Sequence, residues 1–287
     1  MTGVPVIPGL TGNLPLSHDI ADYPEGIVLA VDKPYRWTSA DVIRKLKFAA
    51  IKHFGKKNLK VGHAGTLDPL ATGVLLVCIG NACKRAQELQ DHDKEYIARI
   101  RFGATTPSYD LEKEVDRRFP FEHITEASVR NALPAFLGEQ EQVAPLFSAK
   151  SVDGVRAYEL ARKLYRSGRL SELDETALGT LQRNKINISE LELLSFGDSS
   201  SPKAPQNDNN ASKRINVADT SALGLPEATV RIVCSKGTYI RAFARDLGEA
   251  LGSGAHLSGL IRSRSGDYRI ESALSLQDSL ALFQIEQ

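Results

Sequence analysis

The sequence predicts an α+β fold. Apolar runs and alternating segments, typical of strands, are interspersed with segments of helical periodicity, and they lack the regular strand–helix alternation of a doubly wound sheet. Of the 287 residues, 42% are hydrophobic and 25% are charged, with a formal net charge of +1. This composition excludes a globally disordered chain, and the length predicts one large or two small domains with a sizeable core.

Several segments are predicted to be strands. Gly26–Asp32 and Val74–Ile79 are short apolar runs, as in buried strands. Lys94–Phe102 alternates, with Tyr96 and Ile100 on the same face, which indicates a half-buried strand. Alternation also predicts strands at Asn187–Phe196 and Thr229–Ser235.

Helices are predicted between these strands. Thr38-Ser39 offers an N-cap for a helix that carries apolar residues at helical spacing and ends at Phe54-Gly55. Thr125–Leu137 has a helical pattern, and Pro134 should kink or end that helix. Further helices are expected at Tyr239–Leu251, closed by Gly252, and at Ser275–Phe283.

Three segments are predicted to lie outside regular structure. Residues 1–25 are rich in proline and glycine, which indicates a poorly ordered tail or an arm over the surface. Asp198–Glu227 contains no aromatic residue and has the composition of a flexible surface insertion between two strands. Gly62–Gly73 carries glycines and a proline, so we expect a loop directly before a buried strand.

Charge is segregated along the chain. Thr38–Lys60 has seven Lys or Arg and one Asp, a net of +6, and Arg156–Arg169 has a net of +4. Ser108–Glu126 has a net of −3. Positive blocks on a nearly neutral protein suggest a surface that faces a polyanion, and charge alone does not separate this from a solvated helix face.

Other signals are missing from the sequence. The three cysteines, Cys78, Cys83 and Cys234, argue against a disulfide framework, and we expect small buried hydrophobes in a reducing cytoplasm. No apolar run reaches the roughly 18 residues of a membrane span, and the N-terminus has no secretory signal. No GxGxxG or Walker motif occurs. The expectation is a cytoplasmic protein without a membrane partner, metal or nucleotide cofactor.

Asp68 stands out within the loop Gly62–Gly73. A loop held over a core strand is a common place for a reactive side chain. Because Asp68 precedes a proline, its backbone is restricted to extended conformations and its side chain to few directions. The alternative is an Asx-turn, in which Asp68 only closes the loop.

The segment GHAGTLDPLATGVLLV resembles the catalytic motif of the TruB-type tRNA pseudouridine synthases. Further segments match that family in the same order, and the resemblance extends over residues 26–283. These segments are Val31-Asp32-Lys33-Pro34, Asp93-Lys94-Glu95-Tyr96, Ser148-Ala149-Lys150, Cys234-Ser235-Lys236-Gly237-Thr238-Tyr239-Ile240-Arg241, Asp246-Leu247-Gly248 and Gly254-Ala255-His256-Leu257. The resemblance implies the pseudouridine synthase fold, a mixed and mostly antiparallel sheet flanked by helices, with an RNA-gripping insertion at residues 145–168.

The resemblance also implies residue roles. Asp68 matches the catalytic aspartate, and Tyr96 matches the tyrosine that stacks on the target base. Tyr239 and Arg241 belong to the late motif, whose arginine pairs with the aspartate. The other substrate-binding residues implied are His63, which helps to hold the rearranged T-loop, Leu260, which lines the base pocket, and Lys33 of the Asp-Lys-Pro element.

The residues alone leave other roles open. Tyr96 could be a core tyrosine of its strand, Tyr239 a helix-terminal packing residue, and Arg241 a phosphate contact or a surface charge. Two departures from the family pattern also bear on the site. Ser258–Arg262 differs from an arginine-rich stretch around Leu260, and Thr106–Asp110 differs from the family's Thr-Asp-Thr-x-Asp element, which argues against a supporting role for Asp110.

The implied activity is the isomerisation of uridine to pseudouridine at position 55 in the T-loop of tRNA, by a monomer without a cofactor. A glycosidase would use two carboxylates, whereas this loop supplies only Asp68, which fits an isomerisation. Asp68 could attack C1′, add to C6 of the base or remove a sugar proton. The competing functions are a non-catalytic tRNA-binding or folding chaperone and an RNA N-glycosylase.

The expected domain organisation is a tail at residues 1–25 and one catalytic domain at 26–287, with insertions at 145–168 and 198–227. Since only residues 255–287 follow Gly254, we expect the form without the C-terminal PUA domain. The basic blocks would then hold the phosphates of the T-arm.

Overall fold

The computed structural model describes residues 16–145, 151–152, 155–156, 183–198, 215 and 217–283. The chain forms two compact units. The first unit is Met1–Ile97, Lys203–Ile215 and Leu260–Gln287, and the second is Ala98–Pro202 and Asn216–Gly259. Strands β4 (Lys94–Phe102) and β12 (Ala255–Ser265) contribute residues to both units.

The first unit contains a mixed sheet in the order β14–β1–β3–β12. Strand β1 (Ile27–Lys33) pairs antiparallel with β3 (Ala71–Ile79) and parallel with β14 (Leu274–Ser275). Strand β3 also pairs parallel with β12 and antiparallel with β2 (Val61–His63). The short β13 (Tyr268–Arg269) pairs antiparallel with β12. The loop between β2 and β3 is the one that carries Asp68.

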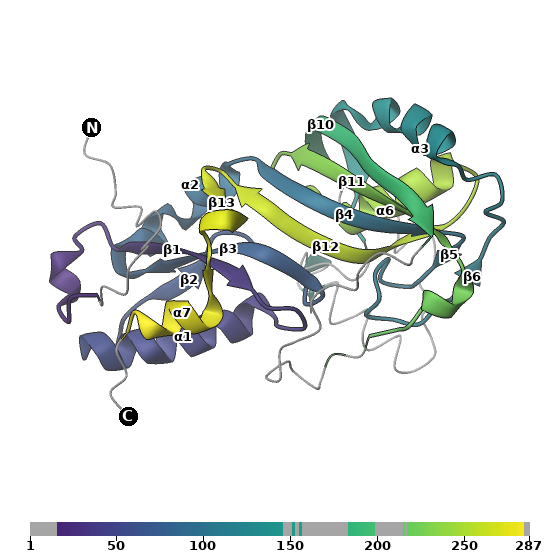
Figure 1. Cartoon of the computed structure of the whole chain (residues 1–287). Coiled ribbons are helices and arrows are strands. Elements are labelled where there is room, and N and C mark those ends of the chain that lie inside the picture. Colours follow the sequence, from purple (N-terminus) through teal and green to yellow (C-terminus); the bar gives the residue numbers. More distant parts are fainter. Residues whose placement is uncertain are drawn as a thin grey trace. The chain divides into compact units, whose positions relative to one another are not determined.

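Two helices lie side by side against this sheet, α1 (Ser39–Phe54) and α7 (Leu276–Ala281) (Figure 1). Thr38 caps α1, because its hydroxyl accepts a hydrogen bond from the Asp41 amide at 3.0 Å. The helix ends at Gly55, whose φ of 61° is the left-handed conformation that glycine adopts most easily.

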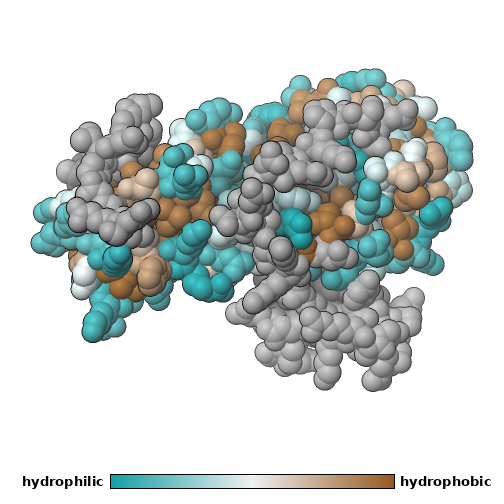
Figure 2. Space-filling view, turned by 60° about the horizontal axis from the view of Figure 1, so that its bottom comes forward, coloured by the Kyte–Doolittle hydropathy of each residue, from teal (hydrophilic) through white to brown (hydrophobic). Residues whose placement is uncertain are grey.

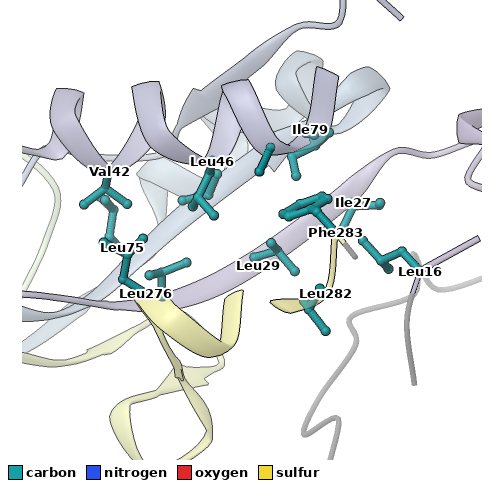
Figure 3. Packing of buried hydrophobic residues seen from close by; sticks show 14 of the residues in the cluster. Leu16, Ile27, Leu29, Val42, Leu46, Leu75, Ile79, Leu276, Leu282 and Phe283 are labelled. Carbon is teal, nitrogen blue, oxygen red and sulfur yellow. The ribbon is translucent and has the colours of Figure 1, made fainter. Parts of the chain in front are cut away.

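The core of the first unit lies between these helices and the sheet. Figure 3 shows labelled side chains from α1, the strands, α7 and the residues directly after α7 pointing toward one another, among them Leu46, Leu75 and Phe283. These three side chains are fully buried. Tyr96 and Leu260 are partly buried and pack against the same cluster. The apolar contacts therefore connect the Asp68 loop, through Leu67, with two of the expected substrate-binding residues.

The second unit has the strand order β12–β4–β11–β10–β7. Strand β10 (Arg183–Asp198) pairs antiparallel with β11 (Pro226–Cys234) and with β7 (Gly138–Val143). Helix α3 (Glu126–Ala132) lies beside β10 (Figure 1). The ring of Phe243 in α6 (Ile240–Ala250) meets that of Phe136 edge-on at 5.4 Å.

The remaining elements are short. They are the helix α2 (Ala86–Asp91), the strands β5 (Ala104–Thr105), β6 (Arg117–Arg118), β8 (Ser151–Val152) and β9 (Val155–Arg156), and the 3-10 turns η1 (Ile20–Asp22), η2 (Gly80–Arg85), η3 (Leu133–Phe136), η5 (Ser221–Leu223) and η6 (Ile270–Ser272). No helix in the described part of the chain is both long and apolar enough to cross a membrane.

The structure confirms the α+β class and most predicted elements. The prediction of a loop over Gly62–Gly73 was wrong at both ends, because Gly62 pairs with Cys78 in β2 and Ala71–Gly73 belong to β3. The strands β7 and β12 were not predicted. Pro134 lies in η3, directly after α3 ends at Ala132, as expected from its missing amide hydrogen.

Several predicted segments lie wholly or mostly outside the described residues. These are the first fifteen residues of the expected tail, most of the RNA-gripping insertion at 145–168 with its Ser148-Ala149-Lys150 motif, the basic block that follows Arg156, and residues 199–214 and 216 of the insertion at 198–227.

Candidate active site

The loop that carries Asp68 is held by hydrogen bonds to its backbone. The hydroxyl of Ser39, at the start of α1, accepts from the Leu67 amide at 2.9 Å and donates to the Leu67 carbonyl at 3.1 Å. The Ala71 amide donates to the Asp68 carbonyl at 3.1 Å. Asp68 itself is partly exposed. The loop is therefore fixed on both sides of Asp68, a residue that is only partly buried.

Lys33 lies beneath the same loop and is 0% exposed. Its Nζ donates to the carbonyl oxygens of Pro34 at 3.0 Å, Trp37 at 2.6 Å and Pro69 at 3.2 Å. Burial lowers the pKa of Lys33 to about 7, and the negative charge of Asp68 acts in the opposite direction. Since all three hydrogens of an ammonium would be directed at carbonyls, this side chain supports the turn at Pro69. A role of Lys33 in substrate binding stays a prediction.

Arg262, a residue of β12, holds the start of the loop that carries Asp68. Its guanidinium donates to the carbonyl oxygens of Gly65 at 3.2 Å and Thr66 at 3.4 Å. In the sequence, Arg262 stands only at the end of the stretch Ser258–Arg262, which departs from the family pattern. Its role was missed because a buried arginine has no periodic signal in a sequence.

His63 is the last residue of β2 and is partly buried. Burial, and then the positive charge of Arg262, lower its pKa, so the imidazole is neutral over a wider pH range than usual. Its Nδ1 is buried and has no hydrogen-bond partner within the described residues. The sequence analysis expected His63 in a loop, whereas the strand gives its backbone a fixed register opposite Val77.

Tyr96 and Leu260 are both partly buried residues of strands in the first unit. Tyr96 lies in β4, and Leu260 lies in β12 opposite Ala71 of β3. Both interpretations of Tyr96 fit this position in part, because the residue packs against the core and is only partly buried.

Arg241 belongs to the second unit and is 5% exposed. Its Nε lies 3.8 Å from Oδ2 of Asp110, and its Nη1 donates to the Ser108 carbonyl at 3.3 Å. Asp110 is also buried, and its Oδ1 accepts from the Ser108 hydroxyl at 2.6 Å and the Glu112 amide at 2.9 Å. Asp110 thus lies next to Arg241 as an ion-pair partner, although its segment departs from the family pattern.

Tyr239 is the N-cap of α6 and has an extended backbone. Its amide donates to Oε1 of Gln142 at 2.8 Å, and its carbonyl accepts from Nε2 of the same side chain at 3.1 Å. Gln142 comes from β7, a strand that was not predicted from the sequence. This pair of hydrogen bonds fixes the backbone of Tyr239 at the start of α6.

Comparison with known proteins decides the family. A model described as "TruB family pseudouridylate synthase (N terminal domain)" matches residues 52–240. A protein named tRNA pseudouridine synthase B from Phocaeicola vulgatus is 49% identical over 256 residues, which covers 89% of this chain and 92% of that protein. The chain belongs to the TruB family. A TruB-family protein of the same name from Thermus thermophilus is 42% identical over 260 residues, covering 87% of this chain and 76% of its own length.

Solved structures share the TruB fold at lower identity. The crystal structure of a Cbf5–Nop10–Gar1 complex contains a chain with a TM-score of 0.57 and 23% identity, covering 91% of this chain. This chain spans about half, 55%, of that one. The similarity confirms the pseudouridine synthase fold.

Relative to the TruB family model, the candidate site residues fall into two groups. His63, Asp68, Tyr96 and Tyr239 lie inside the matched range, whereas Lys33, Arg241 and Leu260 lie outside it.

The outer face of α1 is strongly basic. Arg44, Lys45, Lys47 and Lys52 are exposed, and Asp41, the one acid of the helix, pairs with Arg44 at 2.8 Å. Phe48 lies among them and is 71% exposed. On the face shown in Figure 2, hydrophobic areas alternate with hydrophilic ones on the described surface. An aromatic ring among cations is typical of surfaces that bind RNA.

Proposed function

We propose that this protein isomerises uridine to pseudouridine in tRNA, at position 55 of the T-loop. The observation that carries the proposal is Asp68, a partly exposed residue held on a backbone that Ser39, Lys33 and Arg262 fix by hydrogen bonds. Membership of the TruB family supports the same reaction.

The reaction breaks the bond between N1 of the base and C1′ of the ribose, turns the base, and forms a bond between C5 and C1′. The proton on C5 is lost and N1 gains one, so the product is an isomer and no oxidant or water is consumed. Attack on C1′, addition to C6 and removal of a sugar proton all require an ionised carboxylate beside the nucleoside. A second carboxylate is not needed, because no leaving group has to be replaced by water.

The target base must first leave its stack, which costs a few kcal/mol. We propose that Tyr96, which is only partly buried, stacks on this base, which would supply about 1–3 kcal/mol. Leu260 would add an apolar wall to the base pocket, and His63 would help to hold the rearranged T-loop of the tRNA. Tyr239 stays a predicted substrate-binding residue. The pairing of Arg241 with Asp68 stays a prediction of the family resemblance.

The basic face of α1 would bind phosphates of the T-arm. Such contacts position the RNA and carry no base information. Specificity would then depend on the shape and splayed bases of the T-loop. A cytoplasmic location, a monomeric state and independence of metal or nucleotide cofactors are further proposals from the sequence.

The proposal is tested with an unmodified tRNA transcript and the full chain. Chemical mapping after incubation should show a single new pseudouridine at position 55, and a transcript with cytidine there should show none. Tight binding without any pseudouridine would favour the chaperone alternative. Release of free uracil would favour an N-glycosylase.

A further inference from the structure

Arg262 is one of the largest fully buried side chains in the described part of the protein, with 1% of its surface exposed. No carboxylate of the described residues lies within ion-pair distance of it. Its guanidinium instead donates three hydrogen bonds to backbone carbonyls: Nε to Val74 at 2.7 Å, Nη2 to Gly65 at 3.2 Å and Nη1 to Thr66 at 3.4 Å. Burying a cation in this way is costly, so these contacts require an explanation.

The three acceptors lie at both ends of the Asp68 loop. Gly65 and Thr66 precede Asp68, and Val74 follows it in β3. The backbone of Arg262 also meets the far end of the loop, because Arg262 is opposite Gly73 in the parallel pairing of β12 with β3. One residue therefore holds the two ends of the loop at a fixed separation.

Gly73 shows how close this approach is. It has a φ of +100°, and a Cβ at this position would lie 2.3 Å from the Arg262 carbonyl oxygen. Any other residue would push β12 away from β3 or force the backbone into a strained conformation. The close approach of β3 to Arg262 in β12 therefore depends on the glycine at position 73.

We propose that Arg262 is a positioning residue for the reaction: its planar guanidinium sets the backbone of Gly65–Thr66 against β3 and so determines where the carboxylate of Asp68 is presented. The inference rests on the proposed function. We expect that lysine cannot replace it, because the guanidinium contacts these carbonyls through three different nitrogens, Nε, Nη1 and Nη2, whereas lysine would have a single nitrogen to reach all three. A displacement of about 1 Å at a reacting group can cost about 100-fold in rate.

The test compares R262K and R262Q with R264Q. Arg264 is a matched control, because it lies on the same strand and donates to the Gly266 carbonyl at 3.2 Å, away from the loop. For each protein, pseudouridine formation on the tRNA transcript gives kcat and KM, filter binding gives the Kd for tRNA, and hydrogen exchange reports the amides of the loop.

R262K and R262Q should both lose about 100-fold in kcat, keep the Kd for tRNA within about threefold, and exchange the loop amides faster. R264Q should match the wild type. Wild-type kcat in R262K would overturn the inference, because charge alone would then suffice. Affinity for tRNA that falls by the same factor as kcat would also overturn it. Unfolding of both variants would overturn it as well, because it would show a purely structural role. Absence of pseudouridine with the wild-type protein would instead overturn the proposed function.

Discussion

The hydroxyl of Ser39 makes two hydrogen bonds to the backbone of Leu67, the residue before Asp68, at 2.9 Å and 3.1 Å. Ser39 is the first residue of α1, so the helix start is tied directly to the candidate catalytic loop. Thr38 caps the same helix, which fixes the position of Ser39. The loop geometry thus depends on a helix whose N-cap is visible in the sequence.

Ser39→Ala should destabilise the protein, because it leaves a buried amide and a buried carbonyl of Leu67 without this partner. The expected loss is about 1–3 kcal/mol of unfolding free energy, measured by denaturant titration. Ser272→Ala is the control, since that hydroxyl is exposed and should change the value by less than about 0.5 kcal/mol. Equal effects of the two substitutions would show that Ser39 does not hold the loop.

The buried Lys33 should make the free energy of unfolding depend on pH. Burial lowers its pKa in the folded state to about 7, so between that pH and its ordinary value the unfolded chain binds the extra proton. Stability contributed by this group therefore rises with pH, by up to about 1.4 kcal/mol per pH unit.

Removal of the titrating group in Lys33→Met should flatten this slope relative to the wild type, in denaturant titrations from pH 7 to pH 10. Lys45→Met, at an exposed position, is the control and should leave the slope unchanged. An unchanged slope in Lys33→Met would mean that Lys33 keeps an ordinary pKa.

The basic face of α1 should contribute to RNA affinity. Replacing both Lys47 and Lys52 by glutamine should weaken tRNA binding and reduce the slope of log Kd against log salt by about one unit for each phosphate that the helix no longer neutralises. Binding titrations at several salt concentrations measure this. Lys185→Gln, exposed on β10, should leave the slope unaltered. If Lys185→Gln lowers the slope as much as the α1 variant does, the contacts to tRNA phosphates are not concentrated on α1.

Asp110→Asn should impair the enzyme through Arg241. The substitution keeps the size of the side chain and removes the negative charge 3.8 Å from the guanidinium, leaving a buried cation less compensated. Loss of a buried partner typically costs about 3–5 kcal/mol of stability, and the looser geometry here favours the lower end.

We expect kcat for pseudouridine formation to fall as well, when it is measured at a temperature at which Asp110→Asn is folded. Asp116→Asn, an exposed carboxylate that accepts from Thr105, is the control and should keep wild-type kcat. Wild-type kcat in Asp110→Asn would show that the orientation of Arg241 does not depend on this carboxylate.

Local signals in the sequence were sufficient for much of the fold. The Thr38 cap and Gly55 gave α1 its correct ends, and the alternation of Lys94–Phe102 gave the exact bounds of β4. Strand β12 was missed because its sequence, with Ser258, Gly259 and Arg262, lacks an apolar alternation. Its partners in β3 and β4 determine that it is a strand.

The part of the candidate site that lies in one contiguous motif was predictable from the sequence. Contacts between residues far apart in the sequence were not. The Asp68 loop is contiguous in sequence. By contrast, Asp110 and Arg241 come from segments more than a hundred residues apart, as do Arg262 and Gly65. Long-range contacts between single polar side chains leave no periodic pattern, so only the structure shows the contacts that Asp110, Gln142 and Arg262 make.

The most direct test of the central claim is the rate of pseudouridine formation by Asp68→Asn on an unmodified tRNA transcript. The substitution preserves shape and removes the carboxylate charge. Pseudouridine at position 55 should be undetectable, while the Kd for tRNA stays within a few-fold of the wild-type value. Pseudouridine formation by Asp68→Asn at the wild-type rate would contradict the assignment of Asp68 as the catalytic residue.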